Sequence, residues 1–248
     1  MSEPACRLRA LAVVVPAHNE QDLLGRCLVA VAESVEMLTS RYPDLVVLTV
    51  VVLDRCRDRS GEIARLAGAR TLAVNAGAVG PARRAGVDWA TSLIGRVPPE
   101  SVWIANTDAD SVVPVDWLVR QVAAAEVGDR LVVGAVLPDP EDLPPATHAA
   151  WRILHRSPGV GAHVHGANLG FTLDAYRAVD GFSAVAEHED RILVDSLLSL
   201  GVTPQPGAEV LTSGRRHGRA PGGFSRYLRE LQRTLDLVDA RMARGELG

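Results

Sequence analysis

Short apolar runs alternate with segments of helical periodicity over the first 137 of the 248 residues, and this alternation constrains the fold most strongly. The runs are rich in Val, Leu and Ile at consecutive positions, which is typical of strands buried on both faces of a sheet. The predicted strands are 11–15, 46–53, 70–74, 102–105 and 131–137, and the predicted helices between them are 20–37, 60–67, 81–94 and 114–126. Strands that alternate with helices form right-handed βαβ units, so we expect an α/β fold with a mainly parallel central sheet flanked by helices.

The second part of the chain has a different character. It opens with a link rich in Pro and acidic residues, 138–145. A strand is predicted near 169–173, and helices are predicted near 146–156, 174–179, 190–200 and 224–242. The segment 215–223 carries Arg, Gly and Pro with few apolar side chains, which is typical of a loop. We expect a single domain over 1–248 that has two halves, rather than two independent units.

All 26 basic residues are Arg, and the chain contains no Lys. This excludes enzymes that form a lysine Schiff base, bind pyridoxal phosphate through lysine or use a P-loop lysine. Anionic ligands must therefore be bound by guanidinium groups, backbone N–H groups, helix N-termini or a metal ion. The net charge of −4 argues against general nucleic-acid binding.

The three cysteines, Cys6, Cys27 and Cys56, are widely spaced and odd in number. This spacing predicts neither a disulfide framework nor a Cys-x-x-Cys zinc site. The longest apolar run, 45–53, is about half the length of a membrane span, and the first residues do not have the pattern of a signal peptide. We therefore expect a cytoplasmic protein with no transmembrane segment.

Asp108 and Asp110 directly follow the predicted strand 102–105. Their carboxylates are therefore expected at the carboxyl edge of the sheet, where open α/β folds bind ligands. Oxygen ligands of this kind suit Mg²⁺ or Mn²⁺, and phosphate usually completes such a site. Because Asp-x-Asp also occurs in ordinary loops and turns, a metal site is one of two interpretations of this pair.

Three further polar segments lie at the ends of predicted strands or the start of a predicted helix. Glu20 follows the first strand, Asp54 and Asp58 follow the second, and Arg83 lies in the first turn of the helix 81–94. Each has a structural alternative: an acid in a first helical turn, a helix cap, or a solvated Arg. Taken singly, none of them identifies a ligand.

Taken together, in this order and spacing, the motifs resemble family 2 glycosyltransferases of the GT-A fold. In the first half the motifs are 14–20, 54–58, 82–86 and 108–110. In the second half, 166–171 with 180–182 resembles the acceptor-side segment of that family, and 188–190 resembles its Glu-Asp motif. The resemblance extends over about residues 10–220. It implies a nucleotide-sugar-binding half (10–137), an acceptor and catalytic half (138–220) and a C-terminal helix within 221–248.

The resemblance implies donor-side roles for residues of the first half. Pro16, Ala17 and Glu20 would line the nucleotide pocket. Asp54 would contact the base, and Arg83 would lie near the diphosphate. These roles together predict a nucleotide-diphosphate sugar as the donor.

The resemblance also implies a metal site. Asp108 would contact the ribose or the metal, and Asp110 would ligate Mn²⁺ or Mg²⁺. His217 lies in a position where a late histidine completes the metal shell in several relatives, and a surface histidine is the alternative. The neighbouring Arg215, Arg216 and Arg219 are expected to close over the diphosphate.

On the acceptor side, the resemblance implies that Asp190 is the catalytic base of an inverting reaction, with Glu189 beside it. Simple first-turn acidity of a helix is the alternative for this pair. Gly166, Asn168 and His188 would lie on the acceptor side.

Two positions depart from the family pattern. Leu53 stands where an acid is usual, and Arg55 stands where a small residue is usual, so the base of the donor is left open. The Gln-x-x-Arg-Trp motif of processive synthases is absent. We expect a metal-dependent, inverting and non-processive glycosyltransferase that acts on a small or carrier-linked hydroxyl acceptor.

Three alternatives stay open. The first is a retaining GT-A enzyme of the glycosyl-phosphoglycerate synthase type, and the second is a sugar-nucleotide-binding protein without catalysis. The third concerns assembly: the C-terminal helix can pack on its own domain or pair with a second copy in a homodimer. A nucleotidyltransferase is disfavoured, because the loop 16–20 lacks the glycines and the basic residue that such enzymes use.

Overall fold

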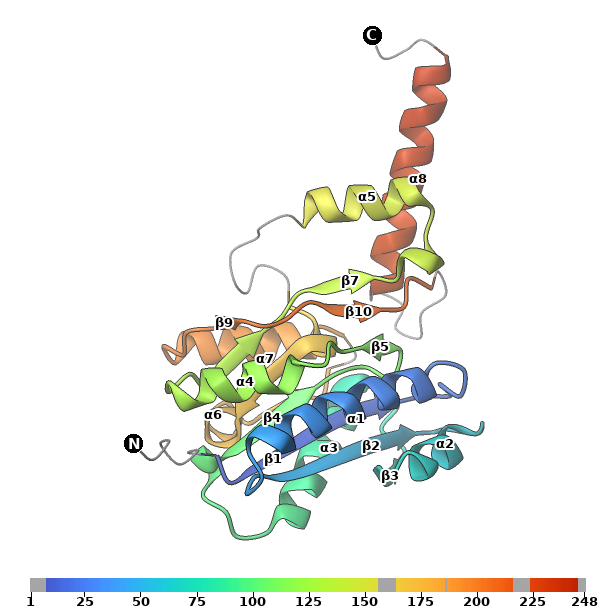
Figure 1. The fold of residues 1–248 in the computed structure, drawn as a ribbon. Coiled ribbons are helices and arrows are strands. Elements are labelled where there is room, and N and C mark those ends of the chain that lie inside the picture. Colours follow the sequence, from blue (N-terminus) through green and yellow to red (C-terminus); the bar gives the residue numbers. More distant parts are fainter. Residues whose placement is uncertain (1–7, 156–163, 186, 216–223, 245–248) are drawn as a thin grey trace.

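The structure is a computed structural model that describes residues 8–155, 164–185, 187–215 and 224–244. Its centre is a seven-stranded sheet with the order β3-β2-β1-β4-β8-β6-β9 (Figure 1). The strands are β1 (Ala10–Ala17), β2 (Val46–Asp54), β3 (Arg70–Val74), β4 (Val102–Asn106), β6 (Leu131–Val133), β8 (Leu169–Thr172) and β9 (Gln205–Pro206). The first four are parallel, and only β8 runs antiparallel to its neighbours β4 and β6. The expected α/β fold with a mainly parallel sheet is confirmed.

Helices cover both faces of this sheet. One face packs against α1 (Leu24–Arg41), α2 (Ser60–Leu66) and α4 (Trp117–Glu126), and the other against α3 (Val79–Ile94), α6 (Leu173–Ala178) and α7 (Glu189–Ser199). A hydrophobic core lies on each face of the sheet. Strand β1 contributes side chains to both cores, because successive side chains of a strand point to opposite faces. Leu11, Val13 and Val15 join the first core, and Ala12 and Val14 join the second.

Two predicted helices begin later than expected. The helix expected from residue 20 begins at Leu24, because the chain first turns with the Leu23 N–H donating to the Glu20 carbonyl. The helix expected from residue 114 begins at Trp117, whose N–H donates to the Pro114 carbonyl in a turn. The first correction places the polar residues 20–22 in a loop after β1 rather than inside a helix.

The single strand expected over 131–137 is wrong. The chain leaves the central sheet at Val133, and β7 (Val136–Pro138) joins β5 (Ser111–Val112) and β10 (Val210–Thr212) in a second, three-stranded sheet. The break lies at Gly134, where an added Cβ would be 2.1 Å from the Asn168 amide nitrogen. The buried Asn168 side chain therefore requires glycine at this point. Short 3₁₀ turns complete the fold at Pro99–Ser101, Pro140–Asp142 and Gly166–Asn168.

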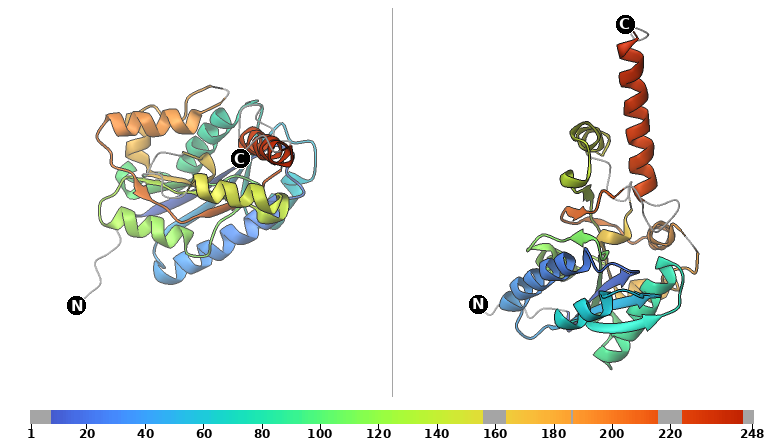
Figure 2. Two further views of the ribbon diagram at one scale, coloured as in Figure 1. Left: turned by 90° about the horizontal axis from the view of Figure 1, so that it is seen from above. Right: turned by 90° about the vertical axis from the view of Figure 1, so that its right-hand side faces the viewer.

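The helices α5 (Pro145–Leu154) and α8 (Phe224–Ala243) lie beyond the small sheet, and α8 extends away from the body (Figures 1 and 2). Trp151 of α5 contacts the Phe224 ring with centroids 5.0 Å apart, which joins the two helices. The outer part of α8 exposes Leu237 and Met242. Pairing with a second copy stays a prediction. Neither α8 nor any other helix in the described segments is long and apolar enough to cross a membrane.

The close approach of α3 to the sheet gives a stability prediction. A Cβ at Gly86 would lie 2.6 Å from methyl groups of Val14 and Val52. Gly86→Ala should therefore lower the free energy of unfolding by about 1–3 kcal/mol in urea titrations, because it overpacks the core. Gly25→Ala in α1 is the matched control, since its nearest neighbour is 3.9 Å away. We expect this control to be neutral or slightly stabilising, and equal stabilities of the two variants would contradict the packing.

Candidate active site

The loops that carry the candidate donor-side residues lie at one edge of the central sheet. Strands β2, β1 and β4 are parallel neighbours, so the segments that follow them emerge side by side. The small sheet adds the segment after β10, because β10 pairs with β5, which follows Asp110 directly. The N-terminus of α7 reaches the same edge through an ion pair. Residues far apart in the sequence therefore converge on the Asp-x-Asp segment.

Arg83 links the two halves of the site. It is 3% exposed, and its Nη2 lies 2.5 Å from Asp108 Oδ1 while its Nη1 donates to Glu189 Oε1. Two glycines make room for this bridge. A Cβ at Gly166 would lie 2.3 Å from the guanidinium carbon of Arg83, and one at Gly80 would lie 2.8 Å from Glu189. Arg83 was expected near a diphosphate, and here both of its terminal nitrogens are engaged by carboxylates.

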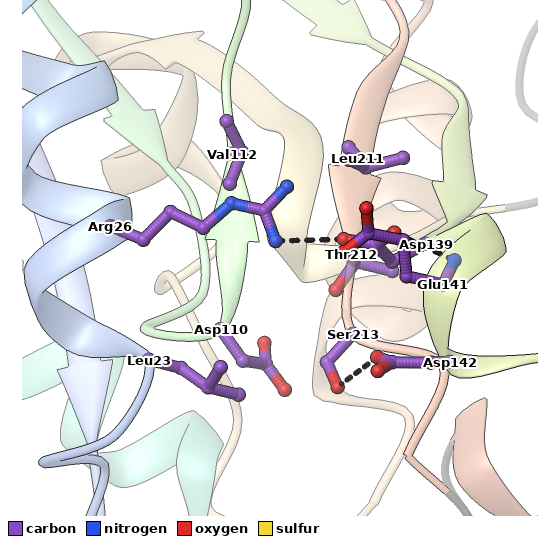
Figure 3. A pocket seen from close by; sticks show the side chains of 10 residues that line it. All are labelled: Leu23, Arg26, Asp110, Val112, Asp139, Glu141, Asp142, Leu211, Thr212 and Ser213. Carbon is purple, nitrogen blue, oxygen red and sulfur yellow. Dashed lines mark hydrogen bonds and ion pairs between the residues drawn. The ribbon is translucent and has the colours of Figure 1, made fainter.

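A second guanidinium engages two further acids of the edge, Glu20 and Asp110. Arg215 donates from Nη1 and Nη2 to the two carboxylate oxygens of Glu20, each at 2.8 Å. The same Nη2 lies 2.9 Å from Asp110 Oδ2. The Ser213 N–H donates to the Asp110 carbonyl at 3.1 Å, which fixes the distance between the two segments. Figure 3 shows a small cavity with the Asp110 and Ser213 side chains on opposite walls.

The environment of Asp110 favours a cation. Burial raises the pKa of Asp110 to about 7, and the charge of Asp108 adds to the effect while Arg215 opposes it. Mg²⁺ and Mn²⁺ are commonly bound by one or two carboxylates together with phosphate oxygens. Asp108 and Asp110 therefore fit a divalent cation completed by a diphosphate. In the described part of the chain no three His, Cys, Asp or Glu side chains form a metal cluster, and His217, Arg216 and Arg219 lie outside that part.

The two acids at the start of α7 have different environments. Glu189 is buried against Arg83, and burial raises its pKa while the charge of Arg83 opposes the rise. Asp190 is only partly buried, and its Oδ2 accepts a hydrogen bond of 2.7 Å from the Gly166 N–H. His188 precedes them in a left-handed conformation (φ 66°) and is exposed. Of the two acids, Asp190 therefore has the carboxylate that an external hydroxyl can reach.

Asp54 joins the ends of β2 and β3. Its carboxylate accepts from the Ala76 N–H at 2.8 Å and from the Gly77 N–H at 2.9 Å. Asp54 is only 7% exposed, so its contact with a base stays a prediction. Beside it lies an open depression that the sequence motifs did not anticipate, lined by Arg55, Cys56, Arg57, Val74 and Asn75.

The other candidates lie in different surroundings. Pro16 and Ala17 are buried at the end of β1. Asn168 is fully buried. Its side-chain oxygen accepts a hydrogen bond from the Trp117 indole at 2.9 Å, and its side-chain nitrogen donates to the Ala135 and Ala208 carbonyls. Its bonds hold the junction of the two sheets together.

Ser60 also contributes to this edge of the sheet, which the sequence pattern did not predict. Its hydroxyl accepts from the Glu20 N–H at 2.8 Å and so fixes the loop after β1. Asp58 helps by accepting from the Gln21 N–H at 2.9 Å. Asp58 was already a candidate from its place in the segment 54–58, whereas a lone Ser carries no signal for a contact 40 residues away.

The chain matches the family model "Glycosyl transferase family 2" over residues 12–174, and it belongs to that family. No curated protein matches the chain. Its expected GT-A fold is confirmed by solved structures of glycosyltransferases. The structure of S. aureus TarS 1-349 has a TM-score of 0.56 at 13% identity, covering 83% of this chain and 61% of that one. This chain therefore spans about six-tenths of that TarS chain.

Two mycobacterial structures are also similar. Glucosyl-3-phosphoglycerate synthase from Mycobacterium tuberculosis, in complex with Mn²⁺, UDP and phosphoglyceric acid, has a TM-score of 0.55 at 18% identity. The match covers 90% of this chain and 77% of the synthase chain. A structure described as a mycobacterial protein has a TM-score of 0.56 at 21% identity, and the match covers 84% of this chain and 68% of that one. At these identities the likeness establishes the fold alone.

The raised pKa of Asp110 gives a pH prediction. An unfolded Asp titrates near 4 and folded Asp110 near 7, so the folded state binds this proton more tightly. The resulting stabilisation is present below about pH 4 and is lost as the pH rises to about 7. In EDTA, Asp110→Asn should therefore raise the free energy of unfolding by about 1–3 kcal/mol at pH 8 and by less at pH 5.

The control for this measurement is Asp44→Asn, which changes an exposed carboxylate between α1 and β2. Urea titrations at the two pH values should show no pH-dependent difference between Asp44→Asn and the unchanged protein. An equal gain for Asp110→Asn at pH 5 and pH 8 would contradict the assignment of a buried, proton-binding Asp110.

Proposed function

We propose that this protein transfers a sugar from a nucleotide-diphosphate sugar to the hydroxyl group of a small or carrier-linked acceptor, with a divalent cation and with inversion at the anomeric carbon. The observation that carries the proposal is the Arg83 bridge between Asp108 and Glu189. Asp108 belongs to the strand-edge pair that suits a metal and a diphosphate, and Glu189 precedes the candidate base Asp190. One buried ion-pair network thus holds the donor side and the acceptor side together.

The donor side supplies charge of the required sign. Asp108 and Asp110 would hold the cation, with His217 as the expected third ligand. When bound, Mn²⁺ or Mg²⁺ would stabilise the negative charge that develops on the leaving diphosphate. Arg83 keeps Asp108 in a fixed orientation, and Glu20, Pro16 and Ala17 would form the floor of the nucleotide pocket.

The acceptor side needs a group that removes the hydroxyl proton. Asp190 suits this role because it is partly exposed, and the Gly166 N–H holds one of its oxygens while the Arg191 N–H holds the other at 2.7 Å. Glu189 suits it less, since Arg83 already engages its buried carboxylate. We therefore assign the base role to Asp190 and a positioning role to Glu189.

The names of the similar structures support a nucleoside diphosphate as the leaving group. One TarS structure is a complex with UDP, and the glucosyl-3-phosphoglycerate synthase structure holds Mn²⁺ and UDP. The second candidate function is a retaining transfer of the glycosyl-phosphoglycerate synthase type, which the likeness to that synthase favours. The anomeric configuration of the product, determined by NMR, separates the two.

Donor binding tests the proposal directly. UDP, GDP and their sugars should raise the melting temperature in the presence of Mn²⁺, with one base preferred, and calorimetry should give a Mn²⁺-dependent affinity for the preferred nucleotide. Asp110→Ala should weaken this affinity by about tenfold or more, because a metal ligand is lost. Asp116→Ala, which removes only the ion pair with Arg120 at the start of α4, is the control and should leave the affinity unchanged. Equal affinities of Asp110→Ala and the unchanged protein would remove Asp110 from the metal site.

Turnover tests the base. Asp190→Asn should keep the donor affinity and lower the transfer rate by about 10²-fold or more, since an amide cannot accept the hydroxyl proton. Asp195→Asn is the matched control, because Asp195 lies on the same helix in an exposed pair with Arg191. Its rate should equal that of the unchanged protein. Full activity of Asp190→Asn would exclude Asp190 as the base.

A further inference from the structure

Arg215 is brought to the metal-binding acids by the architecture of the small sheet. Strand β10 runs antiparallel to β5 with Thr212 opposite Ser111, so the residues beyond Thr212 run back beside Asp110. The turn is fixed by Asp142, whose carboxylate accepts from the Ser213 hydroxyl at 2.9 Å and from the Gly214 N–H at 2.8 Å. The position of Arg215 therefore follows from paired backbone rather than from a chance orientation of its side chain.

The guanidinium of Arg215 lies between two carboxylates, at a place where a metal cation would also bind. It joins Glu20, from the loop after β1, to Asp110, from the loop after β4. Glu20 is 7% exposed and Asp110 is 15% exposed at the side chain, so little water screens these pairs. The contact with Asp110 is made through Oδ2 at 2.9 Å. A metal ion bound through this oxygen would have to displace the guanidinium.

We propose that Arg215 is a built-in counter-cation of the metal site, which neutralises Asp110 and Glu20 in the donor-free protein and competes with the divalent cation for Asp110. This inference rests on the proposed metal-dependent function. Because the guanidinium and the metal bind the same oxygen, their binding is mutually exclusive there. The competition lowers the affinity of the donor-free protein for metal.

The donor removes this competition. A guanidinium binds two phosphate oxygens in the same bidentate way in which it binds the two oxygens of a carboxylate. An arriving diphosphate therefore offers Arg215 another partner, and Asp110 becomes free for the metal. Metal and nucleotide diphosphate should consequently bind with positive coupling, and Arg215 is the residue that produces part of that coupling.

The test measures Mn²⁺ binding without turnover, by electron paramagnetic resonance of free Mn²⁺, in the full chain with and without UDP or GDP. Without nucleotide, Arg215→Gln should bind Mn²⁺ about tenfold more tightly than the unchanged protein, since the competing charge is gone. Arg215→Lys should give a smaller gain, because lysine keeps the charge but loses the fork that spans both acids. It also provides a second reading if Arg215→Gln does not fold.

Arg26→Gln is the matched control. Arg26 pairs with Asp139 at 2.7 Å and lines the same small cavity as Asp110 (Figure 3). Removing this charge tests long-range electrostatics without removing a partner of Asp110, and we expect a change of no more than about twofold.

The outcomes separate the inference from the proposed function. Unchanged or weaker Mn²⁺ binding by both Arg215 variants in the absence of nucleotide would overturn the counter-cation role, while Asp110-dependent binding with nucleotide would still support the metal-dependent function. If no protein bound Mn²⁺ in an Asp110-dependent way under any condition, both ideas would fall together. Equal gains in Arg215→Gln and Arg26→Gln would also overturn the inference, because general electrostatics would then explain them.

Discussion

The site depends on one buried interaction, the bridge from Arg83 to Asp108 and Glu189. Arg83 and Glu189 are both buried, and removing one partner of such a pair costs about 3–5 kcal/mol. The bridge therefore fixes α7 against the sheet edge. Two glycines, Gly80 and Gly166, are required to accommodate it. The Gly166 N–H then holds Asp190. The orientation of the candidate base is therefore a consequence of the same packing that buries Arg83.

A second guanidinium balances the remaining charge. Arg215 engages Glu20 and Asp110 from the small sheet, whereas Arg83 engages Asp108 and Glu189, so these four acids are divided between two arginines. In a chain without lysine this division has a physical advantage, because a guanidinium can engage two carboxylates at once. In the proposed counter-cation role, Arg215 stays paired with Glu20 and Asp110 until a divalent cation and a ligand with phosphate oxygens compete for these side chains.

Much of the fold follows from local pattern. The buried runs of β1, β2 and β4 and the periodicity of α1 and α3 predict the parallel sheet, and the acidic pair after β4 predicts the edge at which ligands bind. The break at Gly134 was not predictable, because it arises from the distant Asn168 side chain. The Arg83 bridge was also not predictable, since Asp108 and Glu189 lie 25 and 106 positions away. Periodicity identifies elements, whereas the partners of a buried charge depend on how those elements pack.

Anomalous diffraction from a crystal soaked with Mn²⁺ and a nucleoside diphosphate would show whether the carboxylates after β4 hold a divalent cation beside a diphosphate. We expect a single manganese peak within coordination distance of Asp110, with the Arg215 guanidinium moved from Asp110 to the phosphate oxygens. A bound nucleotide with no manganese peak near Asp108 or Asp110, and with Arg215 still paired to Asp110, would contradict it.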